Sequence, residues 1–184
     1  MIHRICELDV ALDTGMRESE QYGLTWDRVV FEAKEIHLPK TKNGDARTVH
    51  MTKRVVRALR ILEQMSLERK RRSADKPNES PENVVFGIRD NRNWWTRAKS
   101  GAKVKGFRWH DLRHTFCSRL AQRGVSLKVI QVLAGHKTIS ITARYAHLDK
   151  TSVLKGLAVL EQDDTPASSA AGHKRKSKTP IGQP

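Results

Sequence analysis

Hydrophobic residues divide the chain into helical stretches that flank one segment with a different period. Residues 2–13 and 52–69 place apolar side chains three and four positions apart, which predicts two helices with buried faces. Gly15 should end the first of these helices, and Thr52 should cap the second. The pattern therefore predicts a core built mainly by helices.

Between these helices the apolar period changes to two. Three runs of this kind predict short strands, at residues 29–31, 36–38 and 49–51. Asn43-Gly44 lies between the last two runs, and this dipeptide suits the positive φ values of a tight hairpin turn. Lys42 would lie on that turn. The expected fold class is α+β, mainly helical, with a small three-stranded antiparallel sheet.

A short helix is predicted just before the strands, in the segment TGMRESEQYGL at residues 14–24. Arg17 and Glu20 lie three positions apart in it, so a helix sets them on one face. Glu20 could therefore hold Arg17 in place.

The second half of the chain returns to helical spacing after a charged surface linker at residues 68–82. Helices are predicted around Trp94 and Trp95, from His110 to about Leu120, over 126–134, from Thr138 through Tyr145, and over about 151–160. Ser126 and Gly135 are suited to cap the third of these at its two ends, which places His136 just beyond it.

Length and composition narrow the class of protein. A chain of 184 residues suggests one domain, expected over residues 1–161, followed by a disordered basic tail at 162–184. No apolar run approaches the ~20 residues of a membrane span, so we expect a cytoplasmic protein without a membrane partner. The two cysteines, Cys6 and Cys117, lack the paired spacing of a metal site.

The chain has a net charge of +15, because it contains 35 Lys and Arg residues against 20 Asp and Glu residues. Such a chain is attracted to polyanions, of which nucleic acid is the commonest. On charge, nucleic acid is therefore the expected partner. On charge alone, a ribosome-associated protein or a merely very soluble basic protein remains an alternative.

The stretch from His110 to Tyr145 supplies candidate chemistry. Cleavage of a phosphodiester by a protein nucleophile needs that nucleophile, cations around the nonbridging oxygens and an acid for the leaving oxygen. Tyr145 is a candidate nucleophile. The ordinary pKa of a tyrosine is ~10, and nearby arginines would favour its phenolate form. Arg113 fits phosphate oxygens, and His110 and His136 can donate hydrogen bonds or move a proton near neutral pH.

Two residues from the first half complete this set. Arg17 offers a second guanidinium for the phosphate, and Lys42 could protonate the departing 5′ oxygen. No metal ion is then needed, because these cations can replace divalent ions. Taken singly, each of these residues also fits an ordinary surface, capping or core position.

The same residues resemble, in order and context, the tyrosine recombinase family of phage-type integrases. The matching segments are TGMRESE, TKNGDARTV, HDLRHTF, LAGH and TARYAH. The resemblance spans about residues 1–160 and implies the DNA breaking-rejoining fold of the catalytic domain. It implies a site-specific recombinase that cleaves and rejoins double-stranded DNA through a 3′-phosphotyrosyl intermediate, and hence a protein associated with the nucleoid.

The resemblance also assigns a role to each position. Arg17, Arg113 and His136 would bind and stabilise the scissile phosphate. His110 would contact that phosphate and assist proton transfer, and Lys42 would act as general acid.

The remaining roles concern the covalent step. Tyr145 would become joined to the DNA 3′ phosphate, and Glu20 would support the site from behind. Because the bond energy is kept in the phosphotyrosine, no cofactor and no metal would be required.

Family members usually carry a separate helical DNA-gripping domain before the catalytic one, and we expect this N-terminal core-binding domain to be absent from the chain. Relatives recombine as tetramers on DNA and often exchange the C-terminal helix, which corresponds here to residues 151–161. An alternative function follows: a DNA-binding module of the same fold with little or no strand exchange.

A zinc hydrolase is the other alternative, because His110 and His114 are four apart on a helix. That motif needs a glutamate after its first histidine, where this chain has Asp111, and further ligands. The charge of Arg113 beside His110 would also oppose a dication.

Overall fold

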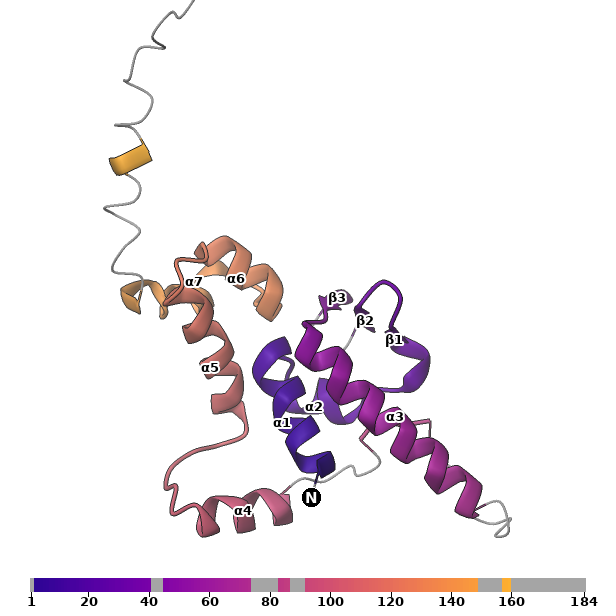
Figure 1. The fold of residues 1–184 in the computed structure, drawn as a ribbon. Helices are drawn as coiled ribbons and strands as arrows, with labels where there is room; N and C mark the ends of the chain where they lie inside the picture. The colour runs from indigo at the N-terminus through magenta and orange to yellow at the C-terminus, as the bar shows by residue number, and fades with distance from the viewer. Residues whose placement is uncertain (1, 41–44, 74–82, 87–91, 149–156, 160–184) are drawn as a thin grey trace, which may run out of the picture. The chain divides into compact units, whose positions relative to one another are not determined.

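The computed structural model describes residues 2–40, 45–73, 83–86, 92–148 and 157–159. The chain divides into two units, residues 1–150 and 151–184, and only the helical residues 157–159 are described in the second. The predicted boundary after residue 161 and the predicted tail lie outside the described residues. The first unit is mainly helical with one small sheet, as predicted from the sequence (Figure 1).

Helix α1 (Ile2–Thr14) packs against helix α3 (Lys53–Ser73) within the larger of two hydrophobic clusters. The sequence prediction that α1 ends at Gly15 is confirmed. Gly15 has a φ of 61°, and a Cβ there would lie 2.4 Å from the ring of Phe116. Glycine suits this position because it alone adopts a positive φ freely and leaves room for the ring.

Helix α3 begins after Thr52, whose hydroxyl accepts a hydrogen bond from the backbone N–H of Val55 at 3.2 Å. The helix continues to Ser73, so the predicted linker at 68–82 was wrong for residues 68–73. Those residues are mostly Glu, Arg and Lys, which are good helix formers where no packing opposes them. The prediction from charged composition therefore placed the end of the helix too early.

Helix α2 (Glu18–Tyr22) and a 3₁₀ turn, η1 (Trp26–Arg28), lead into the sheet. Its strands are β1 (Val29–Val30), β2 (Glu35–Leu38) and β3 (Arg47–His50), antiparallel in the order β1-β2-β3. Ile36 lies opposite Val49, and both are buried, so one face of the sheet points into the core. The predicted turn at Asn43-Gly44 lies outside the described residues.

Helices α4 (Arg92–Gly101), α5 (His110–Ala121), α6 (Leu127–Ala134) and α7 (Ile139–Ala143) form the second half, followed by the turn η2 (Ala146–Leu148). Both predicted caps of α6 are confirmed: Ser126 accepts the N–H of Val129 at 3.4 Å, and Gly135 has a φ of 67°. Tyr145 lies in a turn after α7, and the prediction that it lies within the helix was wrong. Its N–H bonds to the carbonyl of Thr142 three residues back, which tightens the chain into a turn.

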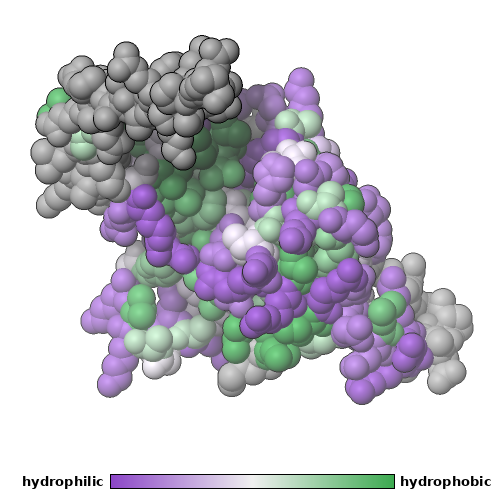
Figure 2. All heavy atoms as spheres, turned by 45° about the horizontal axis from the view of Figure 1, so that its top comes forward, coloured by the Kyte–Doolittle hydropathy of each residue, from purple (hydrophilic) through white to green (hydrophobic). Residues whose placement is uncertain are grey.

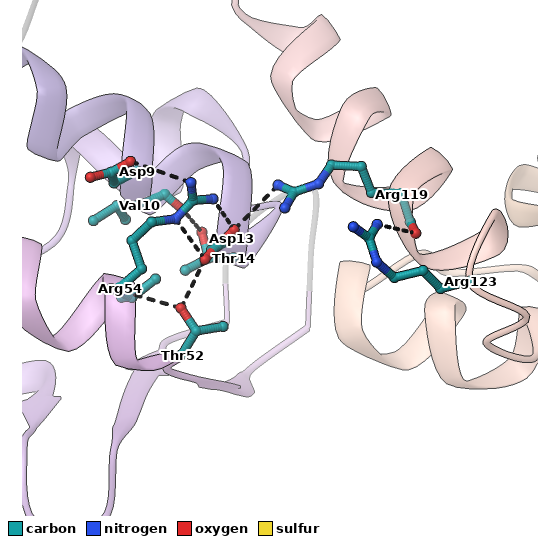
Figure 3. A network of polar contacts seen from close by, with 9 residues as sticks. Asp9, Val10, Asp13, Thr14, Thr52, Arg54, Arg119 and Arg123 are labelled. Carbon is teal, nitrogen blue, oxygen red and sulfur yellow. Dashed lines mark hydrogen bonds and ion pairs between the residues drawn. The ribbon is translucent and has the colours of Figure 1, made fainter.

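A polar network joins α1, α3 and α5 at the end of α1 (Figure 3). The carboxylate of Asp13 accepts hydrogen bonds from Thr52 and from Nε of Arg54, each at 2.9 Å, and pairs with Arg119 of α5 at 3.4 Å. Burial raises the pKa of Asp13, but the hydrogen bonds from Arg54 and Thr52 outweigh it, and the pKa is lowered. The network fixes the end of α1 against α5.

The described surface is mainly hydrophilic on the face drawn in Figure 2, where hydrophobic residues show in patches between the charged ones. This agrees with the 30% of charged residues in the sequence. None of the described helices combines the length and the apolar character that crossing a membrane requires.

Candidate active site

Arg17 and Glu20 are held together at the start of α2. The backbone N–H of Arg17 donates to one carboxylate oxygen of Glu20 at 2.7 Å, and its guanidinium donates to the other at 2.6 Å. A second guanidinium nitrogen of Arg17 reaches the carbonyl of Gly135, 3.3 Å away beyond α6. Glu20 thus lies where the sequence predicted a residue that supports Arg17.

Arg47 on β3 binds the same carboxylate, and sequence reasoning did not single it out. Its two terminal nitrogens donate to the two oxygens of Glu20 at 2.8 and 3.1 Å. Burial raises the pKa of Glu20, yet the hydrogen bonds and charges of Arg47 and Arg17 lower it to about 2. The only sequence signal was the position of Arg47 in the segment TKNGDARTV.

Arg113 lies on α5 and is only 4% exposed. Its guanidinium donates to the carbonyl of Gly15 at 2.6 Å, so the residue that ends α1 also aims this arginine. Burial, and after it the charges of Arg17 and Arg47, lowers the pKa of Arg113 to about 10. Arg17 and Arg47 both bind Glu20, and their charges act on the buried guanidinium of Arg113, which remains charged at neutral pH.

His136 follows the left-handed cap of α6, and its Nδ1 lies 2.8 Å from the hydroxyl of Thr142. Burial, and then the charges of Arg113 and Arg17, lowers the pKa of His136 to about 4. The imidazole is therefore neutral near pH 7, so of the two roles expected from the sequence the lowered pKa favours hydrogen-bond donation over proton transfer. When Nδ1 accepts the threonine proton, Nε2 carries the ring proton and can donate to a phosphate oxygen.

A basic cavity of about 190 Å³ opens at this point. Its lining includes four cationic side chains and one imidazole: Arg17, Arg47, Lys128, Lys137 and His136. Asp45 is its one acidic residue. Such a cavity suits an anion, because cations outnumber the carboxylate at its rim and guanidiniums match phosphate oxygens.

Tyr145 is placed differently from what the sequence predicted. Its side chain is 5% exposed, and its hydroxyl lies 2.6 Å from Nδ1 of His114. Burial, and then the neighbouring thiol of Cys117, raises the pKa of Tyr145 to about 12. Arg144 and Arg113 do favour the phenolate, as expected from the sequence, but desolvation outweighs their charges in this conformation.

His110 begins α5 and is exposed, with its ring 4.8 Å from that of His114 and perpendicular to it. Neighbouring groups still remove part of the water around this ring, and this partial desolvation, followed by the charges of His114 and Arg113, lowers the pKa of His110. Among the described residues, no set of three His, Cys, Asp or Glu side chains is arranged to hold a metal ion. The zinc alternative thus has no third ligand there, and Nδ1 of His114 is already engaged with Tyr145.

The structure therefore brings Arg17, Arg113, His136 and Glu20 into one site and keeps Tyr145 buried against His114. Lys42 lies outside the described residues, so its role as general acid stays a prediction. Sequence reasoning missed Arg47 and considered His114 only as a possible zinc ligand, not as the partner of Tyr145. Each looks like an ordinary polar residue until its partner, far along the chain, is known.

The chain is similar to known integrases over most of its length. A family model described as "Phage integrase family" matches residues 1–152. The integrase of Salmonella phage P22 is 34% identical over 149 residues, which cover 77% of this chain and 38% of that protein. The chain therefore spans well under half of that curated relative.

Solved structures give the same result. The catalytic domain of bacteriophage HP1 integrase has a TM-score of 0.63 at 25% identity, covering 86% of this chain and 83% of that one. The Tn1549 transposon integrase in complex with circular intermediate DNA has a TM-score of 0.62 at 25% identity, covering 84% and 59%. The predicted fold of a tyrosine recombinase catalytic domain is thereby confirmed.

Proposed function

Because this chain belongs to the phage integrase family, the tyrosine recombinases, we propose that it cuts and rejoins double-stranded DNA through a covalent bond to Tyr145. The observation that carries the proposal is the convergence of Arg17, Arg113 and His136 beside a basic cavity. The DNA complex of the similar Tn1549 integrase supports DNA as the substrate.

The two arginines hold the scissile phosphate before and during the reaction. Arg17 faces the cavity with 27% of its side chain exposed, whereas Arg113 approaches from the interior, aimed by the carbonyl of Gly15. Negative charge on the nonbridging oxygens grows in the pentavalent transition state, so fixed positive charge stabilises that state most. His136 donates a hydrogen bond from its neutral ring to the same oxygens.

In the covalent step, the phenol oxygen of Tyr145 forms a bond to phosphorus as the bond from phosphorus to the 5′ oxygen breaks. Lys42 gives a proton to the departing 5′ oxygen, and the phenol loses its own proton, with His110 assisting the transfer. The 3′ phosphate stays on the tyrosine, and attack by a 5′ hydroxyl reverses the sequence. No cofactor is consumed, because one ester replaces another.

A second candidate has one observation in its favour. Tyr145 is buried and bonded to His114, so this conformation holds the nucleophile away from the cavity. A protein that kept it there would occupy DNA without cutting it. We propose that DNA binding draws the turn after α7, which carries Tyr145, outward. A recombinase would make this movement, whereas a protein that only binds DNA would not.

A nicked suicide substrate tests the choice, since the short fragment beyond the cleavage site diffuses away and traps the covalent state. We expect a protein–DNA adduct that survives denaturant with the native chain and disappears with Tyr145→Phe. Equal gel shifts with both proteins and no adduct with either would establish the binding module and reject the recombinase.

We also propose that assembly on DNA uses residues 151–161, which would place a tetramer on two duplexes at the nucleoid. Leu157 and Val159 are 55% and 57% exposed, so their apolar side chains are free to dock on a neighbouring copy. Leu157→Asp should reduce assembly on duplex DNA in analytical ultracentrifugation. Unchanged sedimentation would rule out this helix as the contact.

A further inference from the structure

Arg47 stands out because the proposed mechanism gives it no task although it touches the site. Its side chain is 14% exposed, against 27% for that of Arg17, and both pair with a Glu20 side chain that is 6% exposed. Arg47 uses both of its terminal nitrogens on Glu20, whereas Arg17 shares its own between Glu20 and the carbonyl of Gly135. Arg47 is thus the deeper of the two guanidiniums.

The charges of this group explain why two arginines meet one carboxylate. Arg17 and Glu20 alone form a pair of zero net charge, which has little attraction for an anion. Arg47 restores one positive charge to the group, so the three side chains together attract a phosphate. The carboxylate still fixes the orientation of Arg17 through its backbone N–H and its guanidinium.

Gly135 gives Arg47 the space that this arrangement needs. A Cβ at Gly135 would lie 2.6 Å from Nε of Arg47, closer than any unstrained contact allows. That nitrogen has no hydrogen-bond partner among the described residues, so it packs against the glycine and the guanidinium tip alone bonds to Glu20. The glycine that caps α6 therefore also admits Arg47 beneath Arg17.

We infer that Arg47 is a positioning residue of the phosphate site, which offsets the charge of Glu20 so that the charge of Arg17 is left for the DNA phosphate. This inference rests on the proposed function for its substrate. The contact between Arg47 on β3 and Glu20 on α2 would then increase the affinity of the site for phosphate.

The test compares four proteins: the native chain, Arg47→Met, Glu20→Gln and the double variant with both changes. The probe is inorganic phosphate, followed through the imidazole NMR signals of His136, which are identified by their loss in His136→Asn. Arg47→Met should weaken phosphate binding by roughly 10-fold, because Glu20 then cancels Arg17. The double variant should regain most of that loss, since removing both charges restores the balance.

A purely structural Arg47 would give the opposite result. The double variant would then bind phosphate no better than Arg47→Met, and the inference would be rejected. Thermal unfolding checks that each variant is folded. If Arg47→Met does not fold, Arg47→Lys takes its place: it keeps the charge, so phosphate affinity within about 3-fold of native supports the inference and a roughly 10-fold loss overturns it.

A matched pair on α3 controls for the change in net charge. Arg60 and Glu63 form an exposed ion pair at 2.9 Å, and Arg60→Met with and without Glu63→Gln repeats the same charge changes. Phosphate binding at His136 should not change in either control. A loss equal to that of Arg47→Met would show that net charge alone acts.

Adduct formation on the suicide substrate separates this inference from the proposed function. If the native chain forms adduct, its rate should follow the same order as phosphate affinity across the four proteins. If the native chain forms none, the proposed function fails, while the phosphate titration still decides the role of Arg47.

Discussion

The hydroxyl of Tyr145 lies 2.6 Å from Nδ1 of His114, so a side chain of α5 holds the proposed nucleophile inside the smaller hydrophobic cluster. Burial there raises the pKa of the phenol to about 12. Release from His114 would return water to the phenol and make it easier to deprotonate.

The first prediction concerns this contact. His114→Ala should admit water to the phenol and lower the pKa of Tyr145 from about 12 toward the ordinary 10. NMR of tyrosine labelled at the ring carbon that bears the hydroxyl measures this pKa, and Tyr22→Phe assigns the two signals. His110→Ala, which removes a neighbour not bonded to the phenol, should leave it unchanged. If the pKa of Tyr145 is unaltered in His114→Ala, the contact with His114 does not keep water from the phenol.

The second prediction separates chemistry from binding at Arg113. Arg113→Ala should reduce adduct formation by roughly 100-fold or more, because it removes buried charge aimed at the phosphate. Nonspecific gel shifts should change little, since many other cations contribute to DNA affinity. Equal losses in the two assays would contradict this assignment.

The third prediction concerns salt. Affinity for a DNA duplex should fall steeply as salt rises, since bound cations release counterions from the phosphates. Lys128→Met and Lys137→Met, at the rim of the cavity, should each flatten the logarithmic slope by about one unit. A flat titration of the native chain would argue against a footprint on the phosphate backbone.

The fourth prediction concerns stability in acid. The pKa of Glu20 is lowered from 4.5 to about 2 in the folded protein, so its ionised form stabilises the fold above pH 4.5, and that stability is lost as pH falls toward 2. The full contribution is about 3 kcal/mol by linkage. The free energy of unfolding of the native chain minus that of Glu20→Gln should shrink across this window. A constant difference would mean that the carboxylate gains nothing from the two arginines.

The fifth prediction concerns Gly135. Gly135→Ala should lower the free energy of unfolding by roughly 1–2 kcal/mol, since alanine resists a positive φ and its Cβ meets Arg47. Gly101→Ala is the matched control, because that glycine lies in α4 with no atom near the added Cβ. The control should be neutral or slightly stabilising in chemical denaturation. If both variants lose a similar free energy of unfolding, Gly135 has no requirement for glycine beyond that of Gly101.

Local signals in the sequence predicted most elements well. Gly15, Ser126 and Gly135 marked helix ends because glycine and serine act there through their own backbone or hydroxyl. The period of two predicted the sheet, because alternate residues of a strand face opposite sides. The end of α3 was missed because charged residues fit an exposed helix as well as a linker.

The sequence named several residues that the structure places together, but it predicted neither the burial of Tyr145 nor the pairing of Arg47 with Glu20. Arg17, Arg113 and His136 could be named from their segments, and the structure brings them together. The burial of Tyr145 depends on its packing against α5, and the pairing of Arg47 depends on the approach of β3 to α2. Both are contacts between distant segments, which no local pattern encodes.

The bond from Arg113 to the carbonyl of Gly15 joins two parts of the chain separated by 98 residues. A fragment beginning at α5 would keep Arg113, His136 and Tyr145 in its sequence and yet lack the group that orients the arginine. The phosphate site as described is therefore complete only where α1 and α5 are packed together. The segment from α5 onward thus contains three of the proposed site residues but not the contact that orients Arg113.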